Sequence, residues 1–311
     1  MDSTSFLQAE FIIIKYERTD HYKKENFMTN FAVIGPGAVG SVITNELRNA
    51  GLDVKLFGRK EQQITLLSAQ QVKLNVSSLV VNQQQFDFIF VAIKATKIAE
   101  IKDALIKMCH DGTIIIVCQN GMGQLPEFTM APAFQAAVYI SGQNKEGHIT
   151  HFRDRKLILP NHEQMLRLKT LLHDTQLEVI ITDDQKTLLW YKMLVNLGIN
   201  TVTALAKNTA VIMEMPAVEK MVRELLAEGI MIANSEGESF QESDIDEILA
   251  IYAGYPPDMG TSMYYDTMNN RLLEYEFIQG EFLRLAQQHK LNTPVLDICC
   301  TLLAAYQYNK K

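Results

Sequence analysis

A glycine-rich turn constrains the fold of this chain more than any other feature. A short apolar run at residues 31–34 leads directly into three glycines spaced as G-x-G-x-x-G, and an amphipathic stretch follows. The first glycine permits a tight turn, the second lets the backbone approach a pyrophosphate, and the third allows close contact between helix and strand. The free N–H groups of the helix would face the phosphates. The sequence therefore predicts dinucleotide binding at Gly35, Pro36, Gly37, Ala38, Val39 and Gly40.

The order of apolar segments predicts an α/β fold with two domains. Val-, Ile- and Phe-rich runs of strand length are separated by segments long enough for crossover helices, which favours a parallel sheet. After residue 183 the apolar positions recur at helical spacing, with Pro216 and Pro294 at helix starts. The expected strands are 31–34, 53–57, 86–93, 113–118, 136–140, 147–151, 156–159 and 177–181, and the expected helices are 184–206, 216–236, 242–254, 262–269, 274–289 and 295–308.

These segments define a Rossmann-type NADP-binding domain at residues 28–183 and an all-α substrate or dimerisation domain at 184–311. Residues 1–27 form an extension with two open interpretations. Translation starts naturally at Met28, or the extension is genuine and packs on the surface. No secretory signal is recognisable in it, because a long apolar core and a small-residue cleavage site are both missing.

Composition excludes several classes of partner. Lys and Arg total 29 against 36 Asp and Glu, a formal net charge of −7, whereas nucleic-acid and anionic-membrane surfaces usually need the opposite sign. No apolar run approaches the roughly 18–20 residues that span a bilayer. The four cysteines, Cys109, Cys118, Cys299 and Cys300, show no C-x-x-C spacing, so reduced thiols in a cytoplasmic setting are expected.

Two basic residues at the end of the second strand favour NADP over NAD. NAD-selective units carry an acidic side chain there, which holds the ribose 2′-hydroxyl, whereas a basic side chain accommodates a 2′-phosphate. Here the strand ends in Phe57, Gly58, Arg59 and Lys60. A guanidinium grips phosphate bidentately, so NADPH is the expected cofactor. The alternative interpretation is that Arg59 and Lys60 are a solvated charge pair.

Three polar residues interrupt a strongly apolar helix at four-residue steps. Lys192, Asn196 and Asn200 lie one above another on one face of the segment 188–205. A solvent-facing stripe is the simpler interpretation, but the other faces of this segment are almost wholly apolar. Buried polar groups need partners, which a ligand with carbonyl, carboxylate and hydroxyl groups would provide. Because burial lowers the pKa of a lysine, Lys192 is a candidate proton donor for hydride addition to a ketone.

At this point the sequence resembles the ketopantoate reductases (2-dehydropantoate 2-reductases). The resemblance covers the chain from about Phe31 to the C-terminus, with the motifs in the family's order. They are the glycine turn, Lys94 after the strand 88–93, Gln119-Asn120-Gly121-Met122-Gly123, the segments 190–200, 261–266 and 271–280, and Asn292-Thr293-Pro294.

The resemblance implies NADPH-dependent reduction of 2-dehydropantoate to pantoate, a step toward pantothenate and coenzyme A. By matching position, Lys192 would be the general acid and Glu274 the second catalytic group, which hydrogen-bonds the substrate near the lysine. Asn196, Asn200 and Ser262 would hold the hydroxyl and carboxylate ends of the substrate. Asn120 would lie between nicotinamide and substrate, and Lys94 would border the cofactor. The family also places both ligands between its two domains.

Taken alone, several of these residues have plainer interpretations. Glu274 and Glu276 both lie near an expected helix start, where acids are favoured by the helix dipole. Only the resemblance selects Glu274. Ser262 could be a helix N-cap, and Asn120 a turn residue.

The chain departs from the family pattern at several positions. Leu272 and Leu273 replace the usual proline and threonine before Glu274, Thr201 replaces a common proline after Asn200, and Gln279 replaces an asparagine. The connection from the second strand to Phe86 is also short. A more apolar rim could shift substrate choice, so a different 2-oxo acid remains an alternative.

Three other functions compete. A D-2-hydroxyacid dehydrogenase acting on another 2-oxo acid is the nearest alternative. A β-hydroxyacid dehydrogenase shares the Lys-x-x-x-Asn helix, but its Ser-Gly-Gly-type loop is replaced by residues 119–123. A non-catalytic NADPH-sensing regulatory protein would not need Lys192, Asn196 and Glu274 together. No metal site is expected, because no H-E-x-x-H or similar cluster occurs. Helical second domains of this kind often mediate dimers, so a homodimer is expected by analogy.

Overall fold

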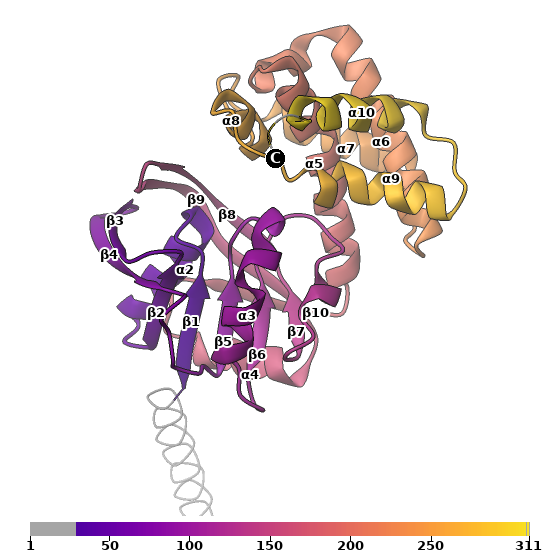
Figure 1. The fold of residues 1–311 in the computed structure, drawn as a ribbon. Helices are drawn as coiled ribbons and strands as arrows, with labels where there is room; N and C mark the ends of the chain where they lie inside the picture. Colours follow the sequence, from indigo (N-terminus) through magenta and orange to yellow (C-terminus); the bar gives the residue numbers. More distant parts are fainter. Residues whose placement is uncertain (1–28, 309, 311) are drawn as a thin grey trace, which may run out of the picture. The chain divides into compact units, whose positions relative to one another are not determined.

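The computed structural model describes residues 29–308 and residue 310, so both interpretations of residues 1–27 lie outside the described part. The chain forms two compact units (Figure 1). Among the described residues, the first holds 29–93, Lys97–Gln119 and Glu127–Asp183; the second holds Lys94–Thr96, Asn120–Pro126 and 184–308 with residue 310. Two short segments from the first half of the sequence therefore belong to the helical unit.

A mixed sheet dominates the first unit. Its strands run in the order β10-β9-β3-β4-β2-β1-β5-β6-β7, and β8 pairs with β9. The strands are β1 (Asn30–Ile34), β2 (Asp53–Gly58), β3 (Gln62–Leu67), β4 (Gln71–Ser78), β5 (Phe88–Val91), β6 (Ile114–Val117), β7 (Ala133–Gln135), β8 (Ala137–Lys145), β9 (His148–Pro160) and β10 (Glu178–Thr182). The helices of this unit are α2 (Ala38–Asn49), α3 (Ile98–Met108) and α4 (Glu163–Leu171).

The predicted parallel pairing holds for the centre of the sheet and fails toward one side. β1 pairs in parallel with β2 and β5, and β5 with β6. β3–β4 and β8–β9 are antiparallel hairpins. The sequence prediction missed β3, β4 and β7, and it divided β9 into two strands. The connection before Phe86 is therefore a hairpin and not a bare loop.

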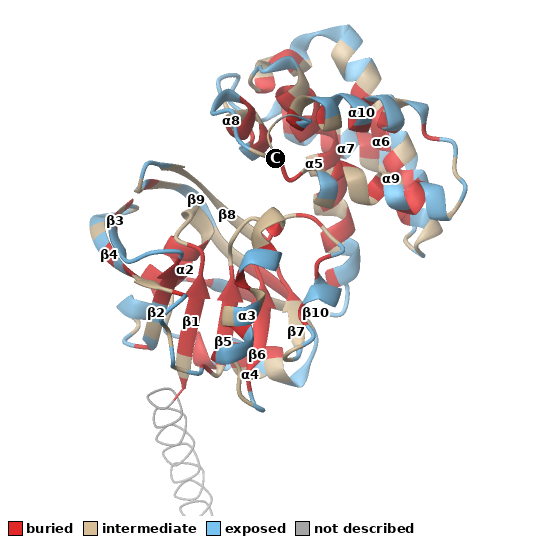
Figure 2. Cartoon of the chain, viewed as in Figure 1, coloured by how far each residue is buried: buried red, intermediate tan, exposed pale blue. Residues whose placement is uncertain are grey.

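The central strands of the sheet are buried on both faces, because side chains of either facing are apolar. Phe31 and Val33 of β1, like Phe88 and Phe90 of β5, join the apolar residues of α2 and α4 in one core cluster. Their sequence neighbours, such as Ile89, point to the opposite face and are equally buried (Figure 2). Runs that are apolar at every position are typical of strands covered on both sides.

The second unit is helical, as predicted, with one helix divided. It contains α5 (Gln185–Ala206), α6 (Pro216–Ser235), α7 (Glu242–Ala253), α8 (Ser262–Met268), α9 (Gln279–Gln288) and α10 (Pro294–Gln307). The predicted helix 274–289 is wrong at its start. Residues Tyr275–Phe277 form a separate 3₁₀ turn, η4, and the backbone of Ile278 (φ −116°, ψ −88°) interrupts the helix before α9. Pro216 and Pro294 both occupy the first turn of their helices, as predicted.

Helix α5 is the central element of the helical unit. Its apolar side chains pack with those of α6, α9 and α10 in a single core cluster, in which Trp190 lies edge-on against Phe282 at 5.5 Å between ring centroids. Thus the helix that carries Lys192, Asn196 and Asn200 packs much of its remaining surface in the apolar core of this unit. None of the helices among the described residues is long and apolar enough to cross a membrane.

Candidate active site

The three glycines of the turn differ in what surrounds them. Gly35 lies at φ +116°, and a Cβ there would come within 2.7 Å of the Ala92 backbone. A Cβ on Gly40 would come within 2.1 Å of the Gly35 carbonyl oxygen. A Cβ on Gly37, by contrast, would meet nothing within 4 Å. Gly37 therefore borders open space at the start of α2.

The N-terminus of α2 is suited to an anion. Gly37 is the N-cap, it offers no side-chain cap, and the first turn carries no acidic residue. The first N–H groups of a helix have no partner within the helix, and together with the helix dipole they attract negative charge. Gly35 donates its N–H to the Phe57 carbonyl at 2.9 Å, which fixes this turn beside the end of β2.

Arg59 and Lys60 follow the end of β2 and are exposed. Within residues 29–308 neither side chain has a hydrogen-bond or ion-pair partner. The structure therefore leaves both cations available to a phosphate group. A solvated charge pair would have the same geometry.

The row Lys192, Asn196 and Asn200 lies on α5, as its spacing predicts. Lys192 and Asn196 are partly buried, and Asn200 is 5% exposed. Neither asparagine side chain forms a hydrogen bond to another described residue. Both amide groups are therefore available to hydrogen-bond a ligand or water.

Lys192 contacts Asn120, which the spacing of the sequence could not reveal. The Nζ atom of Lys192 donates to Oδ1 of Asn120 at 3.0 Å. Asn120 is held in place by its neighbours: Met122 donates its N–H to the Phe277 carbonyl at 3.0 Å, and a Cβ on Gly121 would come within 2.3 Å of that same oxygen. The loop after β6 thus fits tightly against η4.

Glu274 is buried and bound to the loop after β5. Its side chain accepts the backbone N–H of Ala95 at 2.9 Å, while the neighbouring Lys94 pairs with Asp266 at 2.5 Å. Burial raises the pKa of Glu274; the Ala95 hydrogen bond and the charge of Lys94 oppose that rise, and the charge of Asp266 adds to it. Burial likewise raises the pKa of Asp266, against the lowering effect of Lys94.

Asp266 is the residue that sequence reasoning missed. It lies in the motif 261–266, and an acidic residue on the buried face of the short helix α8 was the signal that could have identified it. Its side chain is 8% exposed, against 40% for its partner Lys94. The charge of Lys94 is therefore already compensated by a buried carboxylate.

The N-cap of α8 is Thr261 and not Ser262. The Thr261 hydroxyl accepts the N–H of Tyr264 at 3.1 Å and also lies 2.8 Å from the Thr203 hydroxyl of α5. Ser262 is exposed in the first turn. The interpretation of Ser262 as the N-cap is thus wrong, and its hydroxyl does not cap the helix.

Two departures from the family pattern contact each other. Gln279 donates from Nε2 to the Thr201 hydroxyl at 2.8 Å, in a fully buried position. Leu273 is 1% exposed and belongs to the core, so it does not form an apolar rim. Leu272 is partly buried, so of the two leucines it alone could contribute to an apolar rim.

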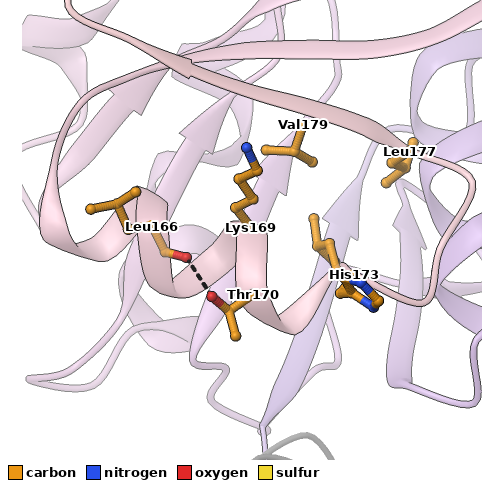
Figure 3. Close-up of a pocket in the computed structure, with 7 residues that line it drawn as sticks. Leu166, Lys169, Thr170, His173, Leu177 and Val179 are labelled. Atoms are coloured by element: carbon orange, nitrogen blue, oxygen red, sulfur yellow. Dashed lines mark hydrogen bonds between the residues drawn. The ribbon is translucent and has the colours of Figure 1, made fainter.

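A surface hollow elsewhere holds none of these residues. It has a volume of about 650 Å³, lies between α4 and β10, and is lined by apolar side chains together with Lys169, Thr170 and His173 (Figure 3). Those three polar residues are exposed, and the Thr170 hydroxyl donates to the carbonyl of Leu166 at 3.0 Å. The hollow therefore has no buried polar side chain in its lining that would select a ligand.

Comparison with known proteins gives a consistent family for both halves of the chain. Residues 31–164 match the family described as "Ketopantoate reductase PanE/ApbA", and residues 184–307 match "Ketopantoate reductase PanE/ApbA C terminal". The 2-dehydropantoate 2-reductase of Mycobacterium tuberculosis is 28% identical over 288 residues, which cover 89% of this chain and 97% of that protein. The corresponding enzyme of Halobacterium salinarum is 24% identical over 298 residues, covering 88% and 98%.

Solved structures agree with this match. A dimeric ketopantoate reductase from Staphylococcus aureus, studied for kinetic cooperativity, superposes with a TM-score of 0.88 at 39% identity, covering 91% of this chain and 100% of that one. A D-mandelate dehydrogenase in complex with NADH and anilino(oxo)acetate superposes with a TM-score of 0.81 at 19% identity, covering 90% and 98%. At that identity the second likeness shows the fold alone.

Proposed function

Because this chain belongs to the ketopantoate reductase family and is an oxidoreductase of that type, we propose that it reduces 2-dehydropantoate to pantoate with NADPH. The observation that carries the proposal is the row on α5. There a lysine hydrogen-bonded to Asn120 is followed by two amides without partners among the described residues. This arrangement offers one proton donor and two amide groups to a small polar ligand.

The first unit supplies the features that NADPH needs. The open space beside Gly37 and the uncapped start of α2 fit a pyrophosphate, and the exposed Arg59 and Lys60 fit a 2′-phosphate. When bound, NADPH supplies the hydride.

The protein's own groups handle the proton and the orientation of the substrate. Lys192 donates its proton to the carbonyl oxygen as negative charge develops there, and Asn120 orients the ammonium group through its Oδ1. Asn196, Asn200 and Ser262 hold the hydroxyl and carboxylate ends of the substrate. Glu274 is the second catalytic group, and its buried carboxyl hydrogen-bonds the substrate near Lys192. Lys94 borders the cofactor, with Asp266 as its counter-ion.

A substrate panel tests the proposal directly. NADPH oxidation is followed spectrophotometrically with 2-dehydropantoate, 2-oxoisovalerate, phenylglyoxylate and oxaloacetate. We expect the highest kcat/KM for 2-dehydropantoate. A higher value for one of the others would favour a D-2-hydroxyacid dehydrogenase, for which the apolar Leu272 is the supporting observation. Tight NADPH binding without turnover of any of the four would favour a sensor protein.

Lys192→Ala tests the role of the general acid. If the lysine donates the proton, turnover should fall by about 10²–10⁴-fold while NADPH binding persists. Lys186→Ala is the matched control, because Lys186 is an exposed lysine at the start of the same helix, where it bonds the Glu236 carbonyl at 2.7 Å. A raised KM with near-normal kcat in Lys192→Ala would reduce the lysine to a binding residue.

We further propose a cytoplasmic homodimer. The dimeric relative from Staphylococcus aureus supports the assembly, and the four free cysteines are compatible with a reducing compartment. Sedimentation equilibrium of the full chain should give twice the monomer mass. A monomer at micromolar concentration would contradict the dimer.

A further inference from the structure

The short connection that carries Glu274 is held by the last turn of the last helix. Residues 269–274 link α8 to η4 without regular structure. The Tyr306 hydroxyl lies 3.1 Å from the Thr267 carbonyl oxygen and 3.4 Å from that of Arg271. Gln307 then accepts the N–H of Leu273 at 2.9 Å through its Oε1. Two adjacent side chains of α10 thus contact the end of α8 and the connection that follows it.

The bond to Gln307 is buried and has no substitute. Gln307 is 7% exposed and Leu273 is 1% exposed. Within the described residues the Leu273 N–H has no backbone acceptor, so the side chain of Gln307 supplies its partner. A buried N–H that loses its acceptor must move or remain unpaired, and both outcomes disturb the local backbone.

Glu274 is the next residue along the chain. Its backbone carbonyl accepts the Phe277 N–H at 3.0 Å, and its carboxyl accepts the Ala95 N–H at 2.9 Å. The carboxyl therefore depends on the backbone on both sides for its position. On the N-terminal side, the hydrogen bond that fixes that backbone comes from Gln307.

We propose that Gln307 is a positioning residue for Glu274, and that it sets the geometry of substrate binding from the end of α10 without touching the substrate. This inference rests on the proposed function of Glu274. It assigns a role to a residue 33 positions further along the chain, in a helix that carries none of the predicted site residues.

The test compares two substitutions of Gln307 in the full-length protein. Gln307→Met keeps the length of the side chain and removes the acceptor, whereas Gln307→Glu keeps an acceptor oxygen. We expect kcat/KM for the 2-oxo acid to fall by about 10- to 100-fold in the methionine variant, since small misplacements of site groups have effects of this size. KM for NADPH should not change, and the glutamate variant should recover most of the loss. Gln288→Met, an exposed glutamine of α9, is the matched control.

A double-mutant cycle distinguishes positioning from loss of stability. If Gln307 acts through Glu274, then Gln307→Met should cost nothing further in a Glu274→Ala background. Losses that add would overturn the proposal. The proposal would also be overturned if the lower rate of the methionine variant were explained by a smaller folded fraction. Thermal unfolding curves give that fraction at the assay temperature.

Hydrogen exchange separates this inference from the proposed function. In the methionine variant, amide exchange in the peptide containing Leu273 and Glu274 should rise at least about tenfold, and in the glutamate variant it should stay near the wild-type rate. Unchanged exchange in the methionine variant overturns the positioning role, whatever the wild-type activity. A wild-type protein that reduces no 2-oxo acid overturns the proposed function, while the exchange result still decides whether Gln307 holds the connection.

Discussion

Burial of two carboxyl groups near Lys94 should make the stability of the helical unit depend on pH. Ionising Glu274 or Asp266 costs free energy in the folded state that it does not cost in the unfolded chain, so both pKa values are raised. A raised folded pKa contributes stability that is fully present below the unfolded pKa and is lost as pH rises through the folded pKa. The ordinary values are 4.5 for Glu274 and 3.8 for Asp266.

Glu274→Gln should therefore change the pH dependence of stability in a defined direction. The variant cannot ionise at this position, so its Tm minus that of the wild type should become more positive from about pH 4 to pH 8. Differential scanning calorimetry across that range measures the difference. Glu276→Gln, which removes an exposed carboxyl two residues away, is the control. A difference that falls with pH would contradict the sign.

Arg59 should determine the preference for NADPH. Arg59→Ala removes a charged hydrogen bond to the 2′-phosphate and should raise the Kd for NADPH by about 10- to 100-fold, with little change for NADH. Fluorescence titration measures both constants. Arg48→Ala, at the exposed end of α2, removes the same charge from the same unit and serves as the control. An equal loss for both cofactors would refute a 2′-phosphate role.

At the residue scale, spacing predicted the row on α5 but not its partners. Lys192 and Asn120 are separated by 72 positions, and no local pattern encodes their contact. The choice of Glu274 over Glu276 came from the resemblance alone; the structure adds a physical difference, because Glu274 is buried and Glu276 is exposed. Asp266 escaped prediction because its role depends on Lys94, which lies on a distant loop.

At the element scale, two glycines of the strand–turn–helix unit should have different roles. One should matter for cofactor binding and the other for folding. Gly37 borders open space, whereas Gly40 lies against the Gly35 carbonyl oxygen. Gly37→Ala should therefore leave Tm nearly unchanged and weaken NADPH binding by about tenfold or more, because the new methyl group occupies the expected path of the pyrophosphate.

Gly40→Ala, by contrast, should destabilise the folded protein. Its Cβ would lie 2.1 Å from a backbone oxygen, so the helix must shift, and we expect a loss of about 1–3 kcal/mol in the free energy of unfolding. Thermal unfolding and cofactor titration of the two variants provide the comparison. If Gly37→Ala proved the less stable of the two, the assignment of the open space would be wrong.

The elements that sequence reasoning recovered are those with strong apolar periodicity. The central strands are apolar at every position, and the helices after residue 183 show a clear helical period. β3 and β4 were missed because the prediction relied on continuous apolar runs. Residues 62–78 instead alternate buried apolar side chains with exposed Gln, Lys and Asn, which is the pattern of half-buried strands. The break before α9 depends on the backbone of Ile278, for which the sequence offers no signal.

At the scale of the whole molecule, a net charge of −7 must be reconciled with two anionic ligands. The cations proposed to attract them are local, and Lys94 is already paired with Asp266. Exposed Arg59 and Lys60 therefore contribute most of the steering that salt can screen. Raising KCl from about 0.05 to 0.5 M should increase KM for NADPH about three- to tenfold. NADH, which lacks the 2′-phosphate, should show a shallower dependence, and identical slopes would contradict this account.

The short segments Lys94–Thr96 and Asn120–Pro126 have a consequence for protein engineering and for evolution. The two family matches divide the chain near residue 184, which invites recombination of halves between relatives. A crossover at that point would separate Glu274 from the Ala95 amide and Lys192 from Asn120. Chimeras should function only when both segments come from the same parent as the helical half. The unit that must be inherited together is therefore discontinuous in sequence.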